Sequence, residues 1–445
     1  MSQSSTPAVS DAIYDASSLG RPRMFVLGLQ HMFAMFGATV LVPVLTGLSV
    51  STTLLFAGIG TLLFHFLSRG KVPAFLGSSF AFIAGYAAVA PNGEAELLPY
   101  ACLGVVCAGL IYVVLAILFA IFGAKKVMKL FPPVVTGPVI ILIGLILAGT
   151  AVNSASANWI LAIIAIAIVI CVNLFGKGMI KILPILIGIL GAYVIGCIVT
   201  AIKPDLFGLP WIDWSSLAGS KIVDVPPFVE YTPLRFLFGA QAFDSAIATN
   251  AIVTFVVVAL AAMVEHIGDI CAIGATCGKN FIADPGLTRT LLGDGIGTSI
   301  AGLFGGPANT TYSENTGVVA LTKVYDPKVM LIAAIMTIIL SFVSIFDAFI
   351  NTIPWSIIGG ISMVLYGMIS ATGVRTIMEN KVDYTNMRNI LITALILVCG
   401  LGFNANPLQI GRLTFGGLAV AAVVGIVVNA ILPGKDYTFD ENIQG

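Results

Sequence analysis

Long apolar stretches separated by short polar ones run through almost the whole chain. A helix needs about 20 mostly apolar residues to cross the hydrocarbon core of a bilayer. Seven such stretches occur in the first half, near 24–46, 51–68, 72–90, 98–122, 131–150, 157–175 and 180–202. After a polar stretch, 203–248, seven more occur near 249–273, 290–305, 307–322, 328–348, 353–373, 387–403 and 411–432. The pattern predicts an all-α polytopic membrane protein with 14 transmembrane segments.

Composition supports a membrane protein and argues against other classes. Hydrophobic residues make up 58% of the 445 residues, charged residues 9%, and the mean hydropathy is +1.04. A soluble domain carries about 25% charged residues, so a soluble enzyme is excluded. The net charge of zero gives no basis for nucleic-acid binding. The seven cysteines form no CxxC pair, and we predict no metal site. Residues 1–20 lack the apolar core of a signal peptide, so the first span is expected to remain in the protein.

The distribution of basic residues predicts the orientation. If the N-terminal side is taken as inside, 17 of the 21 Lys and Arg residues fall in inside loops or tails. The other four, Lys203, Lys221, Arg235 and Arg412, fall outside. Cytoplasmic loops of membrane proteins carry such an excess of basic residues. We therefore predict a multi-pass protein of the cytoplasmic membrane, with the tails 1–23 and 433–445 in the cytoplasm.

The two sets of seven segments indicate an internal duplication. The first repeat would comprise residues 24–202 and the second 249–432, joined by an extracellular connector, 203–248. Because seven is an odd number, the second repeat would lie inverted in the membrane. Transporters often have this architecture, with the substrate bound near the midplane where helices are broken. The sequence therefore favours a secondary transporter.

The third segment of each repeat opens with residues that form poor helix. Residues 72–80 read Val-Pro-Ala-Phe-Leu-Gly-Ser-Ser-Phe, and residues 305–315 read Gly-Gly-Pro-Ala-Asn-Thr-Thr-Tyr-Ser-Glu-Asn. Pro and Gly disfavour helix, whereas Thr and aromatic residues suit short extended segments. Non-helical backbone at membrane depth is tolerated only against protein or a water-lined cavity. An ordinary kinked helix is the alternative, but the matched positions favour two broken segments at a substrate site.

Ionisable residues inside the predicted spans are candidates for the site, because a charge at membrane depth is costly. Glu265 and Asp269 are four residues apart, so both lie on one face of a helix. Glu314 follows the second broken segment, and His31 lies in the first span. A structural role satisfied by a neighbouring carbonyl remains open for Asp269 and His31, and it is the better interpretation for His266.

These residue types indicate the chemistry of the substrate. A buried carboxyl without a cationic partner can bind and release a proton, so Glu265 and Glu314 favour proton-coupled transport with no other cofactor. A carboxyl also both donates and accepts hydrogen bonds when protonated, which suits a flat substrate with alternating donors and acceptors. Backbone N–H groups of an unwound segment add donors. Phe80 or Tyr312 could stack on a planar ring.

Several runs of residues resemble the nucleobase/ascorbate transporter family, and within it the proton-coupled uracil permeases. They lie at 30–31, 36–43, 76–82, 265–268, 309–322, 359–367 and 381–384, so that the similarity covers about 24–432. The strongest match is the run from Asn309 to Tyr312, followed by Glu314 and Asn315. Such runs in this order are specific to the family.

The resemblance implies a fold and a site. The fold has two inverted seven-segment repeats, with short antiparallel strands in segments 3 and 10. Segments 1–4 and 8–11 form a core domain, 5–7 and 12–14 a gate domain, and the protein is a homodimer. We assign substrate binding to Glu265, Glu314, Phe80, Ser313, Tyr312, Ser79 and Tyr366. We assign proton coupling to Glu265, Glu314, Asp269 and His31, and a structural role near the site to Asn315.

Three positions bear on specificity. Many purine and ascorbate carriers of the family have Gln at the position of Glu314, so Glu314 favours uracil. In a well-known uracil permease, however, the residue that matches Ser313 is Gly and the residue that matches Asp269 is His. A proton-path role of that His cannot be copied to this chain. Asp269 could carry a proton in its place, or it could be the counterpart of His266.

The sequence thus predicts proton-coupled uptake of a nucleobase, uracil, by alternating access. A xanthine or other purine symporter is the first alternative. An anion carrier or channel on the same fold is less favoured, because no Lys or Arg lies near the broken segments, although helix N-termini could attract an anion. An intramembrane enzyme would need a nucleophile–base pair or a metal constellation, and the sequence provides neither.

Overall fold

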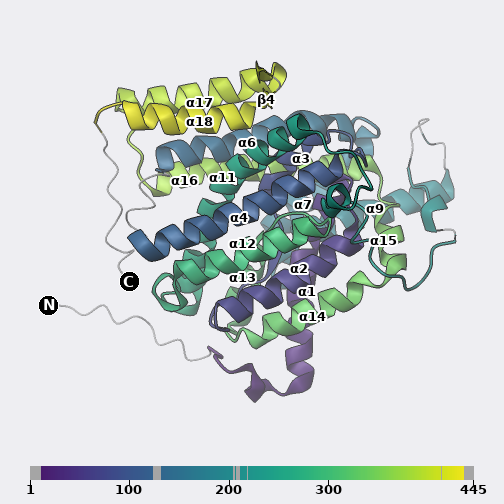
Figure 1. The fold of residues 1–445 in the computed structure, drawn as a ribbon. Coiled ribbons are helices and arrows are strands. Elements are labelled where there is room, and N and C mark those ends of the chain that lie inside the picture. Colours follow the sequence, from purple (N-terminus) through teal and green to yellow (C-terminus); the bar gives the residue numbers. More distant parts are fainter. Residues whose placement is uncertain are drawn as a thin grey trace.

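The structure, a computed structural model, describes residues 12–123, 132–203, 206, 211–217, 219–411 and 413–434. The predicted cytoplasmic loop around 124–131, residues 1–11 of the N-terminal tail and residues 435–445 of the C-terminal tail lie outside the described residues. Long helices make up a bundle (Figure 1). Within the described residues, eight helices are long and apolar enough to cross a membrane, and a bent helix pair raises this to nine. The chain is therefore a multi-pass membrane protein.

The first half contains helices near the predicted spans. After a short 3-10 turn η1 (Ala16–Leu19), they are α1 (Arg21–Thr46), α2 (Val50–Leu67), α4 (Leu98–Phe122), α6 (Pro133–Ala155), α7 (Trp159–Phe175), α8 (Met179–Ile182) and α9 (Pro184–Ile202). The predicted third segment is broken into strand β1 (Leu76–Ser78), the 3-10 turn η2 (Phe80–Phe82) and helix α3 (Ile83–Val89). The described residues of the connector include η5 (Ser215–Leu217), α10 (Leu234–Leu237) and the first turn of the helix that follows.

The second half holds the remaining helices and strands. Its elements are α11 (Ser245–Cys277), the turn η6 (Ile282–Gly286), α12 (Leu287–Leu303), β2 (Asn309–Thr311), α13 (Ser313–Thr322), α14 (Lys328–Ser341), α15 (Ser344–Ile350), α16 (Trp355–Glu379), α17 (Met387–Ala405), β3 (Leu408–Ile410), β4 (Leu413–Phe415) and α18 (Gly417–Ile431). Strand β2 and helix α13 occupy the predicted tenth segment, so both predicted broken segments are confirmed.

Three predicted spans differ from the structure. The span predicted at 328–348 is not one helix, because α14 and α15 meet at an angle of 83°. Val343 is non-helical there, and the carbonyl of Phe342 accepts the backbone N–H of Asp224 in the connector. The span predicted at 180–202 is divided before Pro184, which cannot donate a helical hydrogen bond. The span predicted at 411–432 begins with strand β4, which pairs with β3 in a hairpin.

Strands β1 and β2 form an antiparallel pair that joins the two halves, with Leu76 opposite Thr311 and Ser78 opposite Asn309. The first residue of each strand is held by a threonine. The Thr61 hydroxyl of α2 donates to the Leu76 carbonyl and accepts the Leu76 N–H, at 3.1 and 2.9 Å. The Thr298 hydroxyl of α12 does the same to Asn309, at 3.0 and 3.2 Å. These contacts satisfy buried backbone groups that no further strand covers.

Gly77 lies in the middle of β1 under the ring of Tyr312. A Cβ added at Gly77 would stand 2.5 Å from that ring and 2.6 Å from the Thr39 hydroxyl oxygen. We expect Gly77→Ala to push Tyr312 away and to lower the free energy of unfolding by about 1–3 kcal/mol, the usual cost of overpacking. Thermal unfolding of the purified protein measures the change. Gly149→Ala on α6 is the control, because its Cβ would meet nothing within 4 Å; equal midpoints for the two variants would contradict the prediction.

The helices pack in two groups. One group, formed by α1, α2, α4, α11, α12 and α14, surrounds the strand pair, and the other comprises α6, α7, α9, α16, α17 and α18. In Figure 1, α17 and α18 lie at the top of the view, above α6 and α16, while α14 lies at the bottom beside α1 and α2. Helix α11 also contacts α6 and α18 of the second group. We call these the strand-bearing group and the outer group.

Loops predicted to share a side of the membrane contact one another. On the side predicted to be inside, Lys71 forms an ion pair with Asp284, and Lys328 forms one with Asp15. On the other side, the Thr232 hydroxyl donates to the Leu303 carbonyl at 2.6 Å. If one span between the two partners of such a contact had been miscounted, the partners would have been predicted on opposite sides of the membrane. The alternation read from the basic residues is thus consistent with the contacts.

Candidate functional site

Two helices bring the predicted carboxyls together beside the strand pair. Helix α11 carries Glu265 and Asp269 in its middle, and α13, which packs against it, begins with Ser313 and Glu314. The Ser313 hydroxyl donates to Asp269 at 2.5 Å, and the Thr311 hydroxyl donates to its other oxygen at 2.9 Å. Asp269 therefore links α11 to the end of β2 and the start of α13, which fixes how Glu265 and Glu314 lie relative to each other.

Both broken segments present uncapped helix starts next to the strands. Helix α13 follows Tyr312, and η2 follows Ser79; neither start has a side chain that caps it. The first N–H groups of a helix have no acceptor within the helix, so they are free to donate to another group. The backbone N–H of Ser313, and that of Phe80 on the other segment, are such donors, whereas the N–H of Glu314 is directed at its own carboxyl. The same two starts therefore offer donors next to the two carboxyls.

The carboxyl-bearing face is accessible, although its residues lie within predicted membrane spans. Glu265, Gly268 and Ser313 are exposed, and Phe80, Asp269 and Glu314 are half-buried. A Cβ added at Gly268 would meet nothing within 4 Å. A charge facing lipid at this depth would be costly. The accessible face is therefore suited to a space that holds water or a polar ligand.

His31 and Asn315 lie behind this face. The Asn315 side-chain nitrogen donates to the His31 carbonyl at 3.0 Å and stands 3.2 Å from its Nδ1, and both residues are buried. The contact joins α1 to the first turn of α13. The structural role of Asn315 stays a prediction, and the contact places His31 beside the residue that follows Glu314 in α13.

Three further residues were predicted to bind substrate, and the structure gives each different contacts: Tyr312, Ser79 and Tyr366. The Tyr312 hydroxyl donates to the Ser78 carbonyl at 2.7 Å and lies 3.0 Å from the Thr39 hydroxyl, so its ring is held against β1. Phe80, the first residue of η2, is therefore the other candidate for stacking on a planar ring, and it is half-buried. The Ser79 hydroxyl is buried without a hydrogen-bond partner among the described residues. Tyr366 is buried in α16, which packs on α6, and no described contact links it to Glu265 or Glu314.

Asp294 on α12 was missed by the sequence analysis. Its carboxyl lies 2.9 Å from Nδ1 of His266, and both side chains are fully buried. His266 therefore has Asp294 as its direct partner, and its link to Asp269 is indirect, through the Thr311 hydroxyl, which lies 3.4 Å from the same Nδ1. The signal was present in the sequence, because Asp294 is an ionisable residue inside a predicted span. Its flanking glycines, Gly293 and Gly295, lie against the side chains of Phe64 and Tyr112 and allow this close packing.

Comparisons with known proteins agree with this arrangement. A family model described as "Permease family" matches residues 22–408. The chain is 39% identical to the uracil permease of Bacillus caldolyticus, over 97% of both chains. It is 38% identical to the uracil permease of Bacillus subtilis (strain 168), over 91% of both. The chain therefore belongs to this permease family, the nucleobase/ascorbate transporter family.

A solved structure shares the fold. The transmembrane domain of a cyanobacterial bicarbonate transporter, BicA, superposes with a TM-score of 0.59. The superposition covers 94% of this chain and 99% of that one, at 14% sequence identity. At this identity the likeness concerns the fold alone. The likeness extends over nearly the whole chain and so includes both packing groups.

Proposed function

We propose that this protein carries uracil into the cell together with protons. The observation that supports this most is the placement of Glu265 and Glu314 on two packed helices, beside two uncapped helix starts. Relatives that span nearly the whole chain are named uracil permeases, at 38–39% identity. The protein is accordingly a transporter and no reaction on the substrate is proposed.

Uracil fits the chemistry of this site. Along one side of its ring, N–H donors alternate with C=O acceptors. A carboxylate accepts from the N–H groups, and a protonated carboxyl also donates to a carbonyl. The backbone N–H groups of Ser313 and Phe80, at the starts of α13 and η2, supply further donors for the carbonyl oxygens. The ring of Phe80 stacks on the flat face of the base.

Protons provide the driving force in this proposal. Among the described residues, no Lys or Arg forms an ion pair with Glu265, Asp269 or Glu314. A carboxyl in that position gains a proton from the outside and loses it to the inside, so that its charge changes during the cycle. Protonation then favours substrate binding from outside, and deprotonation releases the substrate inside. His31 and Asp269 are the further residues that we assign to proton coupling.

The proposed membrane organisation has fourteen segments in two inverted repeats and both termini in the cytoplasm. The matching contacts of Thr61 with Leu76 and of Thr298 with Asn309 support two equivalent repeats. The strand-bearing group corresponds to the core domain and the outer group to the gate domain. Alternating access results when the core moves against the gate. A homodimer is part of this proposal.

Uptake into liposomes tests the function. We expect labelled uracil to accumulate when the inside is alkaline, and accumulation to stop when the pH gradient is removed at constant membrane potential. Unlabelled uracil should compete, whereas xanthine, adenine and ascorbate should not. Competition by xanthine instead would indicate a purine symporter. Uptake that is indifferent to the pH gradient would contradict the coupling.

A further inference from the structure

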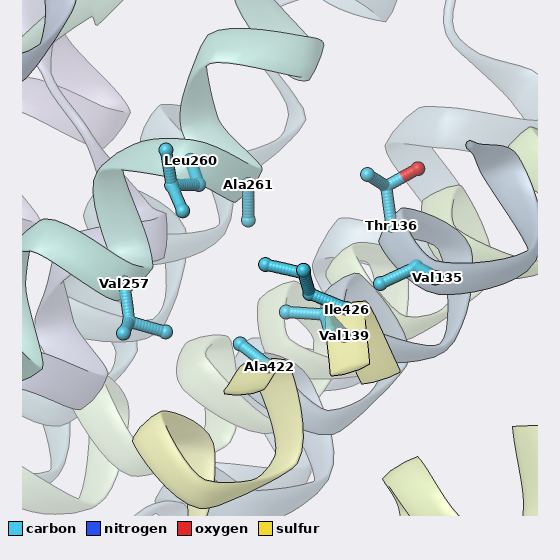
Figure 2. A pocket seen from close by; sticks show the side chains of 8 residues that line it. All are labelled: Val135, Thr136, Val139, Val257, Leu260, Ala261, Ala422 and Ile426. Carbon is cyan, nitrogen blue, oxygen red and sulfur yellow. The ribbon is translucent and has the colours of Figure 1, made fainter. Parts of the chain in front are cut away.

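An apolar cavity lies where the core domain meets the gate domain (Figure 2). It has a volume of about 300 Å³, which includes space open to the surroundings. Val257 and Ala261 of α11 line one side, and Ala422 and Ile426 of α18 line another. The third side is formed by one stretch of α6 that includes Thr136, whose hydroxyl is directed to the Pro132 carbonyl at 3.5 Å. The cavity therefore offers carbon surface and no free donor.

The cavity adjoins the carboxyl-bearing face. Ala261 precedes Glu265 by four residues, so the two side chains lie on one face of α11, about 6 Å apart along the helix axis. Gly268, on the same face, borders open space. This face of α11 therefore presents, in order along the helix, the apolar cavity at Ala261, the carboxyl of Glu265 and the open space at Gly268. The cavity is therefore next to the place where the proposed substrate meets Glu265, on the side of the gate.

The edges of uracil differ in polarity. N1–H, C2=O, N3–H and C4=O follow one another around the ring and are all polar. C5–H and C6–H form the one apolar edge. The carboxyls and the free N–H groups that match the polar edge all belong to the core domain, on α11, α13 and η2. A base bound by its polar edge to the core turns its C5–C6 edge toward the gate.

We propose that this cavity is a subsite for a small apolar substituent on the C5–C6 edge of a pyrimidine base. The inference rests on the proposed function, because it needs a pyrimidine held by the core carboxyls. Only about 20 Å³ of the cavity can hold the centre of a water-sized group, which suits a methyl group or a halogen, and Ala261 and Ile426 set its depth. The side chain at position 261 then determines which pyrimidines the carrier accepts.

Competition against labelled uracil uptake tests the subsite. The competitors are uracil, 5-methyluracil, 5-iodouracil, 5-propyluracil and 6-methyluracil. Inhibition by each is measured with the wild-type protein and with the variants Ala261→Leu and Ile426→Ala. Leucine at position 261 fills the cavity. The affinity for 5- or 6-substituted bases, relative to the affinity for uracil, should therefore fall at least about tenfold, because a single methylene that does not fit an apolar pocket has an effect of this size. Ile426→Ala enlarges the cavity and should raise the relative affinity for 5-propyluracil. Such a gain cannot result from misfolding.

Ala275→Leu is the matched control, because Ala275 is exposed near the cytoplasmic end of the same helix. Its relative affinities should equal those of wild type. If Ala261→Leu weakens uracil and the substituted bases equally, or if Ile426→Ala gains nothing for 5-propyluracil, the cavity is only a packing gap and the proposal is wrong. Absence of uracil uptake by wild type would instead refute the proposed function, so the two failures can be told apart.

Discussion

Glu314→Gln is expected to abolish uphill uptake of uracil and to weaken uracil binding at least about tenfold, since a hydrogen bond to a charged group contributes about 1.5–3 kcal/mol. Glutamine keeps the size of the side chain, but it cannot change its charge during the cycle. Binding is measured by the shift of the unfolding temperature with uracil concentration, and uptake is measured in liposomes with an alkaline interior. The defect in uptake should exceed the defect in binding.

Glu379→Gln is the control for this substitution. Glu379 lies at the end of α16, pairs with Arg375 at 2.7 Å and has a side chain that is 59% exposed. An exposed pair of this kind contributes at most about 1 kcal/mol, so both measurements should match wild type. Uphill uptake by Glu314→Gln at the rate of this control would rule out Glu314 as the coupling carboxyl. Glu265→Gln, measured in parallel, then identifies whether the other carboxyl carries the proton.

Asp294→Ala is expected to lower the free energy of unfolding by about 3 kcal/mol or more, because it leaves His266 buried without its partner. Replacing both members of a buried pair by apolar residues of similar volume is often much less costly. The double variant His266→Leu with Asp294→Leu should therefore recover part of the stability that Asp294→Ala loses. Thermal unfolding of the purified variants measures both effects.

Asp284→Ala provides the comparison for Asp294. Asp284 precedes the same helix, α12, but its ion pair with Lys71 is exposed, with side chains 66% and 40% accessible. Its loss should change stability by no more than about 1 kcal/mol. If Asp284→Ala and Asp294→Ala destabilise equally, burial is not what makes the His266 pair important.

The sequence predicted most of the helices because hydropathy alone identifies long apolar segments. It also located both broken segments, since Pro73 and Pro307 open them and small polar residues follow. It placed Glu265, Asp269 and Glu314 near one another, and the hydrogen bonds of Ser313 and Thr311 with Asp269 agree with this. Glu265 and Asp269 share a helix face by spacing, whereas the proximity of Glu314 followed from the resemblance.

What the sequence could not predict depends on contacts between distant segments. At the bend near Val343, the Phe342 carbonyl accepts the N–H of Asp224, which lies more than a hundred residues earlier. The hydropathy of the segment itself does not indicate this contact. The pairing of His266 with Asp294 rather than Asp269 depends on how α11 and α12 pack, which helical spacing does not determine. The same holds for Tyr312, a plausible stacking residue by composition, whose hydroxyl instead bonds to β1.

During synthesis, strand β1 leaves the ribosome long before its partner exists. The Tyr312 hydroxyl that bonds to the Ser78 carbonyl belongs to a residue 234 positions later. Until β2 is inserted, the backbone groups of β1 on that side have no protein partner, and unpaired groups at membrane depth cost several kcal/mol each. A chain that ends before β2 therefore leaves these groups of β1 without a protein partner. Strand β1 consequently depends on the second half of the chain for its final hydrogen bonding.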